Sequence, residues 1–72
     1  MDLKIKALEK RYESIILEAK ATLEVYLDNA VGIGEHPQII DEMDKLVGKL
    51  ADAQGKLDTL KEYTTTTKKD YY

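Results

Sequence analysis

Apolar side chains recur every three or four residues through the first part of the chain. They lie at Ile5, Leu8, Tyr12, Ile15/Ile16, Ala19, Leu23, Tyr26/Leu27 and Ala30. These intervals match one face of an α-helix, whereas the alternation of a β-strand fails where Ile15, Ile16 and Leu17 are adjacent. The pattern predicts a helix over about residues 2–31, and its stripe shifts between Ala19 and Leu23, where steps of four follow one another.

A second apolar stripe follows an unbroken spacing of four and three residues, at Ile39, Met43, Leu46, Leu50, Ala53, Leu57 and Leu60. This spacing is typical of a coiled-coil seam and predicts a helix over about residues 37–63. Gly48 and Gly55 lie on one face of that helix, which allows either the close approach of another helix or simple exposure. Residues 64–72 begin with four Thr, which are poor helix formers, and we expect a flexible tail there.

The strongest helix-breaking residues lie between the two stripes. Gly32 suits the end of one helix, and Pro37 suits the first turn of the next. A turn over about residues 32–36 is so short that the two helices must be antiparallel. We therefore predict an all-α fold, an antiparallel two-helix hairpin (αα-hairpin) over residues 1–63.

The apolar stripes are wider than a lone hairpin can cover. Leu17, Val25, Ile40 and Val47 flank them, and this chain of 72 residues has no Cys for disulfides or a thiolate metal site. We expect a homo-oligomer, a dimer by default, that completes a helical bundle. An obligate partner protein and a marginal monomer are the alternatives. The expected oligomer core consists of Leu8, Tyr12, Ile15, Ala19, Leu23, Tyr26, Ile39, Met43, Leu46, Leu50, Leu57 and Leu60.

Charge is distributed unevenly along the predicted hairpin. The net charge is only −3, yet residues 21–44 contain six acidic side chains and no Lys or Arg. Because these residues surround the turn, one end of the hairpin is acidic and the other, with both termini, is mildly basic. The acidic end is the expected binding site for a basic protein surface, and we define the acidic tip as Glu24, Asp28, Glu35, His36, Asp41, Glu42 and Asp44. A merely solvated acidic end and a cation site are the alternatives, although no EF-hand-like ligand spacing is present.

Basic residues are sparse elsewhere. Lys4, Lys6, Lys10 and Arg11 form one cluster that acids interrupt, so we expect no nucleic-acid binding. The longest apolar run is three residues, which excludes a membrane span, and the N-terminus lacks the apolar segment of a signal peptide. Intrahelical ion pairs with the favourable four-residue spacing are expected at Asp2–Lys6, Asp41–Lys45 and Asp52–Lys56.

Side chains suited to catalysis are scarce. The one Ser, Ser14, lies within the first predicted helix, and the one His, His36, lies in the turn, about 30 Å away on a helix that rises ~1.5 Å per residue. The two cannot form a nucleophile–base pair within one chain. No Cys is present, and no His lies in either helix to build a carboxylate-bridged metal site. We therefore predict a protein that is not an enzyme and that uses no cofactor or metal.

The segment VYLDNAVGIGEHPQIIDEMDKLVGKLADAQGKL, residues 25–57, resembles a family of small uncharacterised helical-hairpin proteins of T4-like tailed phages. The resemblance is carried by Tyr26, Leu27, Asn29, the turn at residues 31–37 and the heptad that follows. It implies an accessory role in the virion or in host takeover, performed in the bacterial cytoplasm. It supplies no catalytic or ligand-binding residues.

Two functional hypotheses follow. The first is a non-enzymatic accessory protein that acts by protein–protein interaction, through its acidic tip and an oligomeric, coiled-coil-like core. The alternative is an oligomeric anti-defence protein that sequesters a cyclic nucleotide, as some helical-hairpin phage proteins do. In that case a base would stack on Tyr12 or Tyr26, and the phosphate would meet Lys6, Lys10 or Arg11.

Overall fold

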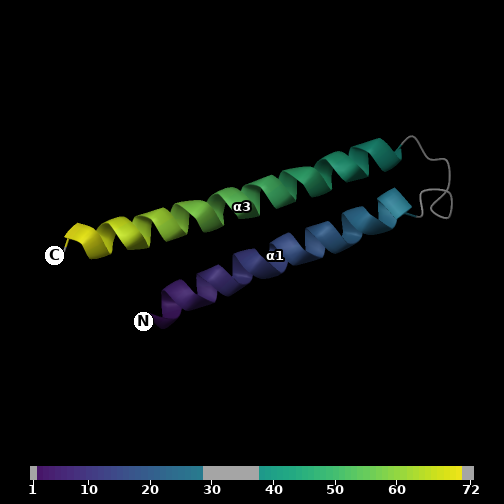
Figure 1. Cartoon of the computed structure of the whole chain (residues 1–72). Coiled ribbons are helices and arrows are strands. Elements are labelled where there is room, and N and C mark those ends of the chain that lie inside the picture. Colours follow the sequence, from purple (N-terminus) through teal and green to yellow (C-terminus); the bar gives the residue numbers. More distant parts are fainter. Residues whose placement is uncertain (1, 29–37, 71–72) are drawn as a thin grey trace.

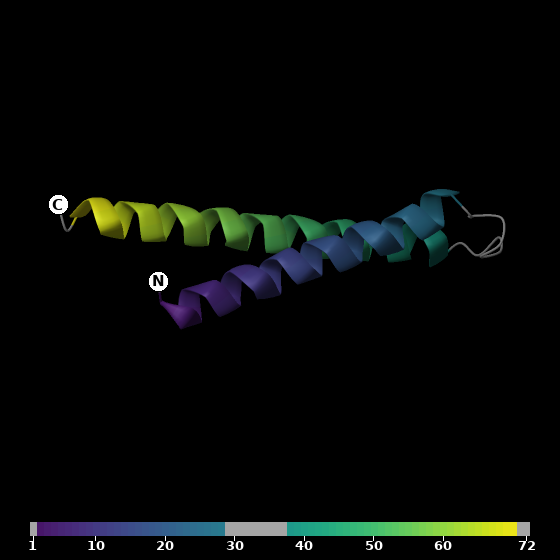
Figure 2. The ribbon, with the colours of Figure 1, turned by 60° about the horizontal axis from the view of Figure 1, so that its bottom comes forward.

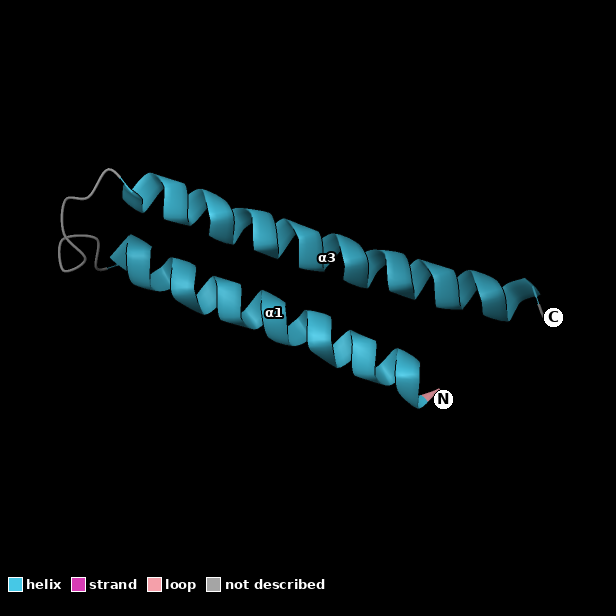
Figure 3. Ribbon diagram, turned by 180° about the vertical axis from the view of Figure 1, so that it is seen from behind, coloured by secondary structure: helices cyan, strands magenta, loops and turns pink. Residues whose placement is uncertain are grey.

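The chain folds into two long helices that lie side by side and antiparallel. The computed structural model describes residues 2–28 and 38–70, and within these ranges every element is helical: α1 (Leu3–Asp28) and α3 (Gln38–Asp70). The start of α1 and the end of α3 lie at one end of the molecule, and the end of α1 and the start of α3 lie at the other (Figure 1; Figure 3). The molecule is a rod of 57 × 17 × 15 Å. The predicted all-α hairpin is confirmed.

Helix α1 begins with a side-chain cap. The carboxylate Oδ1 of Asp2 accepts a hydrogen bond from the backbone N–H of Lys4 at 2.8 Å, and the carbonyl of Asp2 accepts one from the N–H of Lys6 at 3.1 Å. The first bond satisfies a backbone donor that the first helical turn leaves without a partner, and the second is the first backbone hydrogen bond of the helix itself. The Asp2 carboxylate therefore serves the helix end, and no ion pair with the Lys6 ammonium forms, contrary to the prediction.

The two helices meet along seams with a seven-residue repeat. In α3 the half-buried or buried positions are the predicted ones, continued by one residue to Thr64. In α1 the spacing of four and three is also unbroken, so the predicted shift of the stripe near Ala19 is wrong. Ile16, rather than Ile15, continues the repeat. Glu9 takes the seam position between Ile5 and Tyr12, and its neighbour Leu8 is half-buried as well. The α1 seam consists of Ile5, Glu9, Tyr12, Ile16, Ala19, Leu23 and Tyr26.

The core between the helices is thin. Among the described residues only Ala19 and Ala53 are buried, each with 2% of its surface exposed. Their small side chains permit a close approach of the two helices, but they contribute little apolar area. The other seam residues are half-buried. A larger group of apolar side chains is exposed on the outside of the hairpin: Leu3, Ile15, Leu17, Val25, Leu27, Ile40, Val47 and Tyr63.

Helix α3 does not end at Tyr63, where the loss of the apolar stripe predicted its end. It runs through Asp70, so most of the expected tail is helical. Thr64 takes the next seam position after Leu60, and its Oγ1 hydroxyl donates to the carbonyl oxygens of Leu60 at 3.0 Å and Lys61 at 3.1 Å. The hydroxyl therefore has partners within the helix, and Thr64 places no unpaired side-chain donor at the seam. The predicted turn at 32–36, the predicted end of the first helix near residue 31, and residues 71–72 lie outside the described residues.

Figure 2 shows the hairpin rotated by 60° from Figure 1, and the two helices cross at a shallow angle along the rod. A shallow crossing is the packing expected when stripes with three- and four-residue spacing interdigitate. The outer face of α3 is open at both of its glycines. A Cβ atom added at Gly48 or Gly55 would meet no atom within 4 Å.

Replacing either glycine by alanine tests whether that face is free in solution. We expect Gly48→Ala and Gly55→Ala each to stabilise the hairpin by about 1 kcal/mol, because Ala has the higher helix propensity and the space is empty. Urea unfolding followed by circular dichroism measures the change. Ala53→Gly is the matched control and should destabilise, since it removes a buried methyl group as well. A loss of stability at Gly55→Ala would mean that another helix covers this face.

Candidate functional site

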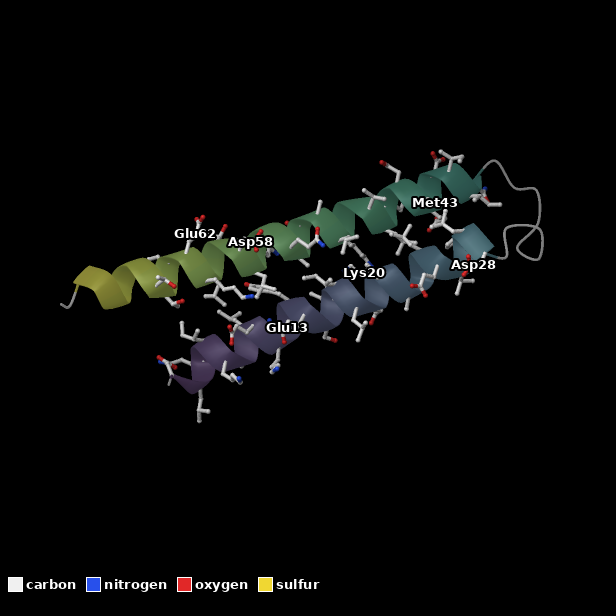
Figure 4. The ribbon with its side chains drawn as sticks, viewed as in Figure 1. Glu13, Lys20, Asp28, Met43, Asp58 and Glu62 are labelled. Atoms are coloured by element: carbon white, nitrogen blue, oxygen red, sulfur yellow. The ribbon has the colours of Figure 1, made fainter. Side chains whose placement is uncertain are left out.

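The hairpin brings together the acidic residues that the sequence places on either side of the turn. Glu24 and Asp28 lie in the last two turns of α1, and Asp41, Glu42 and Asp44 lie in the first two turns of α3. All five side chains are exposed. Figure 4 shows Asp28 at the end of the rod where α3 begins. The other predicted members of the acidic tip, Glu35 and His36, lie outside the described residues.

The negative charge of the acidic tip is largely uncompensated. Glu42 pairs with Lys45 at 3.4 Å between Oε1 and Nζ, so the predicted Asp41–Lys45 pair is replaced by a Glu42–Lys45 pair. Within residues 2–28 and 38–70, no ion pair involves Glu24, Asp28, Asp41 or Asp44.

Helix dipoles act differently on the two sides of the acidic tip. Asp41 lies in the first turn of α3, where the positive end of the dipole favours a carboxylate. The last turn of α1 contains Asp28 and no basic residue, so the dipole and the carboxylate repel there. This unfavourable charge has no structural partner among the described residues, and a cation brought by another molecule would relieve it.

Metal chemistry is not supported by the arrangement of the described side chains. No group of three or more His, Asp or Glu residues within these ranges is placed to hold one ion.

The predicted oligomer core lies inside the hairpin. All but one of its residues are half-buried or buried between α1 and α3, and all of these except Leu8, which lies next to the seam, are seam residues within a single chain. The exception is Ile15, which is 38% exposed at the edge of the seam. The seam residues thus already pack against each other within one chain, and a role for them in an oligomer stays a prediction.

Three exposed apolar residues line one side of the hairpin near the acidic tip, and we call Leu27, Ile40 and Val47 the apolar flank. They are 68%, 71% and 52% exposed. Each directly follows a seam residue, in α1 for Leu27 and in α3 for the other two. In an antiparallel helix pair, residues that occupy this position of the repeat face the same side. The sequence identified Ile40 and Val47 as flanking residues, but it did not join Leu27 to them.

The opposite side of the hairpin contains two grooves that meet at Asp52. The larger, of about 610 Å³, is open and is lined by Tyr12, Ala51, Asp52, Gly55, Lys56, Thr59, Leu60 and Tyr63. The smaller, of about 240 Å³, is lined by Ile15, Glu18, Ala19, Thr22, Leu46, Lys49 and Asp52. The absence of a side chain at Gly55 helps to open the larger groove, and sequence reasoning did not find this feature.

The predicted ligand-binding residues are only partly brought together. Tyr12 lines the larger groove, whereas Tyr26, Lys6, Lys10 and Arg11 line neither groove. Lys10 instead pairs with Glu13 at 3.2 Å on the surface of α1. The cation nearest to Tyr12 in the larger groove is Lys56, which sequence reasoning did not select.

Lys56 is held by the ion pair that the sequence predicted. Its Nζ lies 3.0 Å from Oδ2 of Asp52, one helical turn earlier, and more than half of each side chain is exposed. The hydrogen bond to Asp52 and the negative charge of that carboxylate raise the pKa of Lys56 above its usual 10.5, against a smaller opposing effect of desolvation. Lys56 is therefore fully protonated at neutral pH.

No family model matches the chain, and neither do the curated proteins or the solved structures that were compared with it. The resemblance of residues 25–57 to phage hairpin proteins therefore stays a prediction. No described helix is both long enough and apolar enough to cross a membrane.

The ion pair in the larger groove has a defined pH dependence. Because the pKa of Lys56 is higher in the folded state, the pair's stabilisation is complete below pH 10.5 and is lost as pH rises through the folded-state pKa. We expect Asp52→Asn to return the pKa of Lys56 to its usual value, measured by an NMR titration of the Lys56 side chain. Asp58→Asn, on the same helix, is the control. An unchanged pKa in Asp52→Asn would show that the pair does not form in solution.

Proposed function

We propose that this chain is a non-enzymatic interaction protein, a helical hairpin that associates with itself and binds a basic protein surface through its acidic tip. One observation carries the proposal: exposed carboxylates from both helices gather at one end of the rod, and residues 21–44 contain no Lys or Arg. A phage accessory role in the bacterial cytoplasm, implied by the resemblance of residues 25–57, is part of this proposal.

The geometry of the acidic tip supports recognition by charge rather than by shape. The described carboxylates are exposed near one end of a rod only 17 × 15 Å in cross-section, and the grooves lie further along the helices. Exposed charges of one sign accelerate encounter with an oppositely charged partner and penalise the wrong partners. The repulsion between Asp28 and the end of the α1 dipole adds to this preference, because a bound cation removes it.

Self-association is supported by the balance between buried and exposed apolar side chains. Only two small residues are buried among those described, whereas eight large apolar side chains are exposed. Single domains of this size usually need an additional source of stability, and the chain has no Cys for a disulfide. A second copy supplies the missing apolar contact without any further component.

A ligand-binding function is the second candidate, and the larger groove favours it. Tyr12 and Tyr63 line the groove together with Lys56, a combination of aromatic and cationic side chains that suits a planar base and a phosphate. The groove is open and Lys56 is already paired with Asp52, so the ligand would have to compete for the ammonium group. This competition makes the groove a weaker candidate than the acidic tip.

The acidic tip is tested with an oligolysine peptide as a defined basic probe, titrated into isotopically labelled protein and followed by NMR. We expect shifts at the amides around Asp28 and Asp41, and the double charge reversal Asp28→Lys/Asp41→Lys should weaken binding about tenfold or more, because the attraction is electrostatic. Binding should also weaken with added salt.

The matched control is Asp58→Lys/Glu62→Lys. These two acids lie on α3 away from the acidic tip (Figure 4), and their reversal changes the net charge by the same amount. The control should keep most of the affinity for the peptide. Equal losses in the two variants would show that only net charge matters and would exclude a site at the acidic tip.

The second candidate is tested by adding cyclic di- and trinucleotides at millimolar concentration and measuring the thermal unfolding midpoint. Binding in the larger groove should raise the midpoint and shift the NMR signals of Tyr12 and Tyr63. Lys56→Gln should abolish the effect, whereas Lys61→Gln, outside the groove, should not. No shift with any of these nucleotides excludes the ligand-binding function.

A further inference from the structure

We infer that the apolar flank is the contact surface for a second copy of this chain, in an antiparallel dimer with two-fold symmetry. The inference rests on the self-association part of the proposed function and specifies which surface associates and in which orientation. It replaces the seam, which the sequence suggested as the oligomer core, with a surface that the hairpin leaves open.

The repeat places the apolar flank on one side of the rod. Ile40 and Val47 are seven residues apart on α3, two helical turns, and therefore lie on the same face. Leu27 occupies the corresponding position on α1. All three residues are more than half exposed. Together they form a surface that extends over both helices close to the acidic tip.

The other surfaces are less suited to a copy of the same chain. The seam is occupied by the packing of α1 against α3. The opposite side contains the two grooves, and both are lined by charged residues, Lys49, Asp52 and Lys56 among them. Near the acidic tip, the apolar flank is interrupted at the same repeat position by a single charged residue, Lys20.

The size of the rod is sufficient for such a contact. If two copies overlap over about two thirds of the 57 Å length and most of the 17 Å width, each covers roughly 600 Å² of the other. This area is at the lower limit of about 600 Å² per partner for a specific, stable interface. A dimer of moderate affinity is therefore the expected form, with four helices around a shared apolar layer.

Charge determines the orientation. A parallel dimer would place the two acidic tips side by side, and like charges at close range oppose association. In the antiparallel dimer, each acidic tip lies beside the middle of its partner, outside residues 21–44, where all the Lys and Arg residues of the chain are found. The outward-facing Asp28 and Asp41, two residues beyond their seam positions, stay accessible to a basic partner.

Sedimentation equilibrium from micromolar to millimolar concentration tests the surface. We expect the unmodified chain to dimerise and Ile40→Gln/Val47→Gln to raise the dissociation constant about tenfold or more. The control is Val25→Gln/Tyr63→Gln, which replaces two equally exposed apolar residues. Tyr63 lines the larger groove, and Val25 lies seven residues after Glu18, which lines the smaller one, so both belong to the opposite side. The control should dimerise like the unmodified chain.

Spin labels test the orientation, and the absence of native Cys makes labelling specific. Gln54→Cys and Lys61→Cys continue the spacing of the apolar flank by one and two repeats beyond Val47, outside the proposed contact centre. In an antiparallel dimer, the label-to-label distance at Lys61→Cys should exceed that at Gln54→Cys by about 20 Å, from a rise of ~1.5 Å per residue on each copy. In a parallel dimer the two distances would be equal.

Each result decides a part of the inference. A monomer at millimolar concentration, or equal weakening of the dimer in the test and control variants, overturns the apolar flank as the contact surface. Equal label distances overturn the antiparallel orientation. Circular dichroism of Ile40→Gln/Val47→Gln checks that the helices persist, and the label distances do not depend on that variant. None of these measurements uses the basic probe, so their failure leaves binding at the acidic tip to be judged separately.

Discussion

The packing of the α1 seam against the α3 seam is the interaction on which every other feature of this molecule depends. Both seams keep the same spacing of four and three residues, so the helices stay in contact along the rod. The most buried positions, however, are Ala19 and Ala53. Alanines permit close approach but exclude little apolar surface from water, and the hairpin therefore has a defined geometry with a small core.

The register of the seams also determines what the outside of the hairpin presents. The residues directly after Tyr26, Ile39 and Leu46 flank the seam on one side, and those directly before Leu50, Leu57 and Thr64 flank it on the other. By this arrangement Leu27, Ile40 and Val47 form an apolar flank, while Lys49, Lys56 and Tyr63 line the grooves on the opposite side. A shift of the register by one residue would mix the two sides, so the separation of apolar and charged surfaces is a consequence of the seam.

Charge separation along the rod adds a second asymmetry. The hairpin folds the acid-rich middle of the chain into one end and leaves the basic residues along its body and near its termini. The two asymmetries are compatible, because the apolar flank and the outward carboxylates of Asp28 and Asp41 occupy different positions of the repeat. The proposed dimer would therefore leave both carboxylates accessible to the proposed basic partner.

The sequence alone determined the features that depend on an unambiguous local pattern. The unbroken spacing of α3 predicted its seam, and the absence of Lys and Arg from residues 21–44 located the acidic tip. Both patterns can be recognised without knowing which residues are in contact in the folded chain. Tertiary packing decided the ambiguous positions. Either Ile15 or Ile16 could have filled the α1 seam, and only contact with α3 selects Ile16. Likewise, Thr64 occupies the next seam position against α1 and α3 continues beyond it, whereas propensity alone predicted a tail.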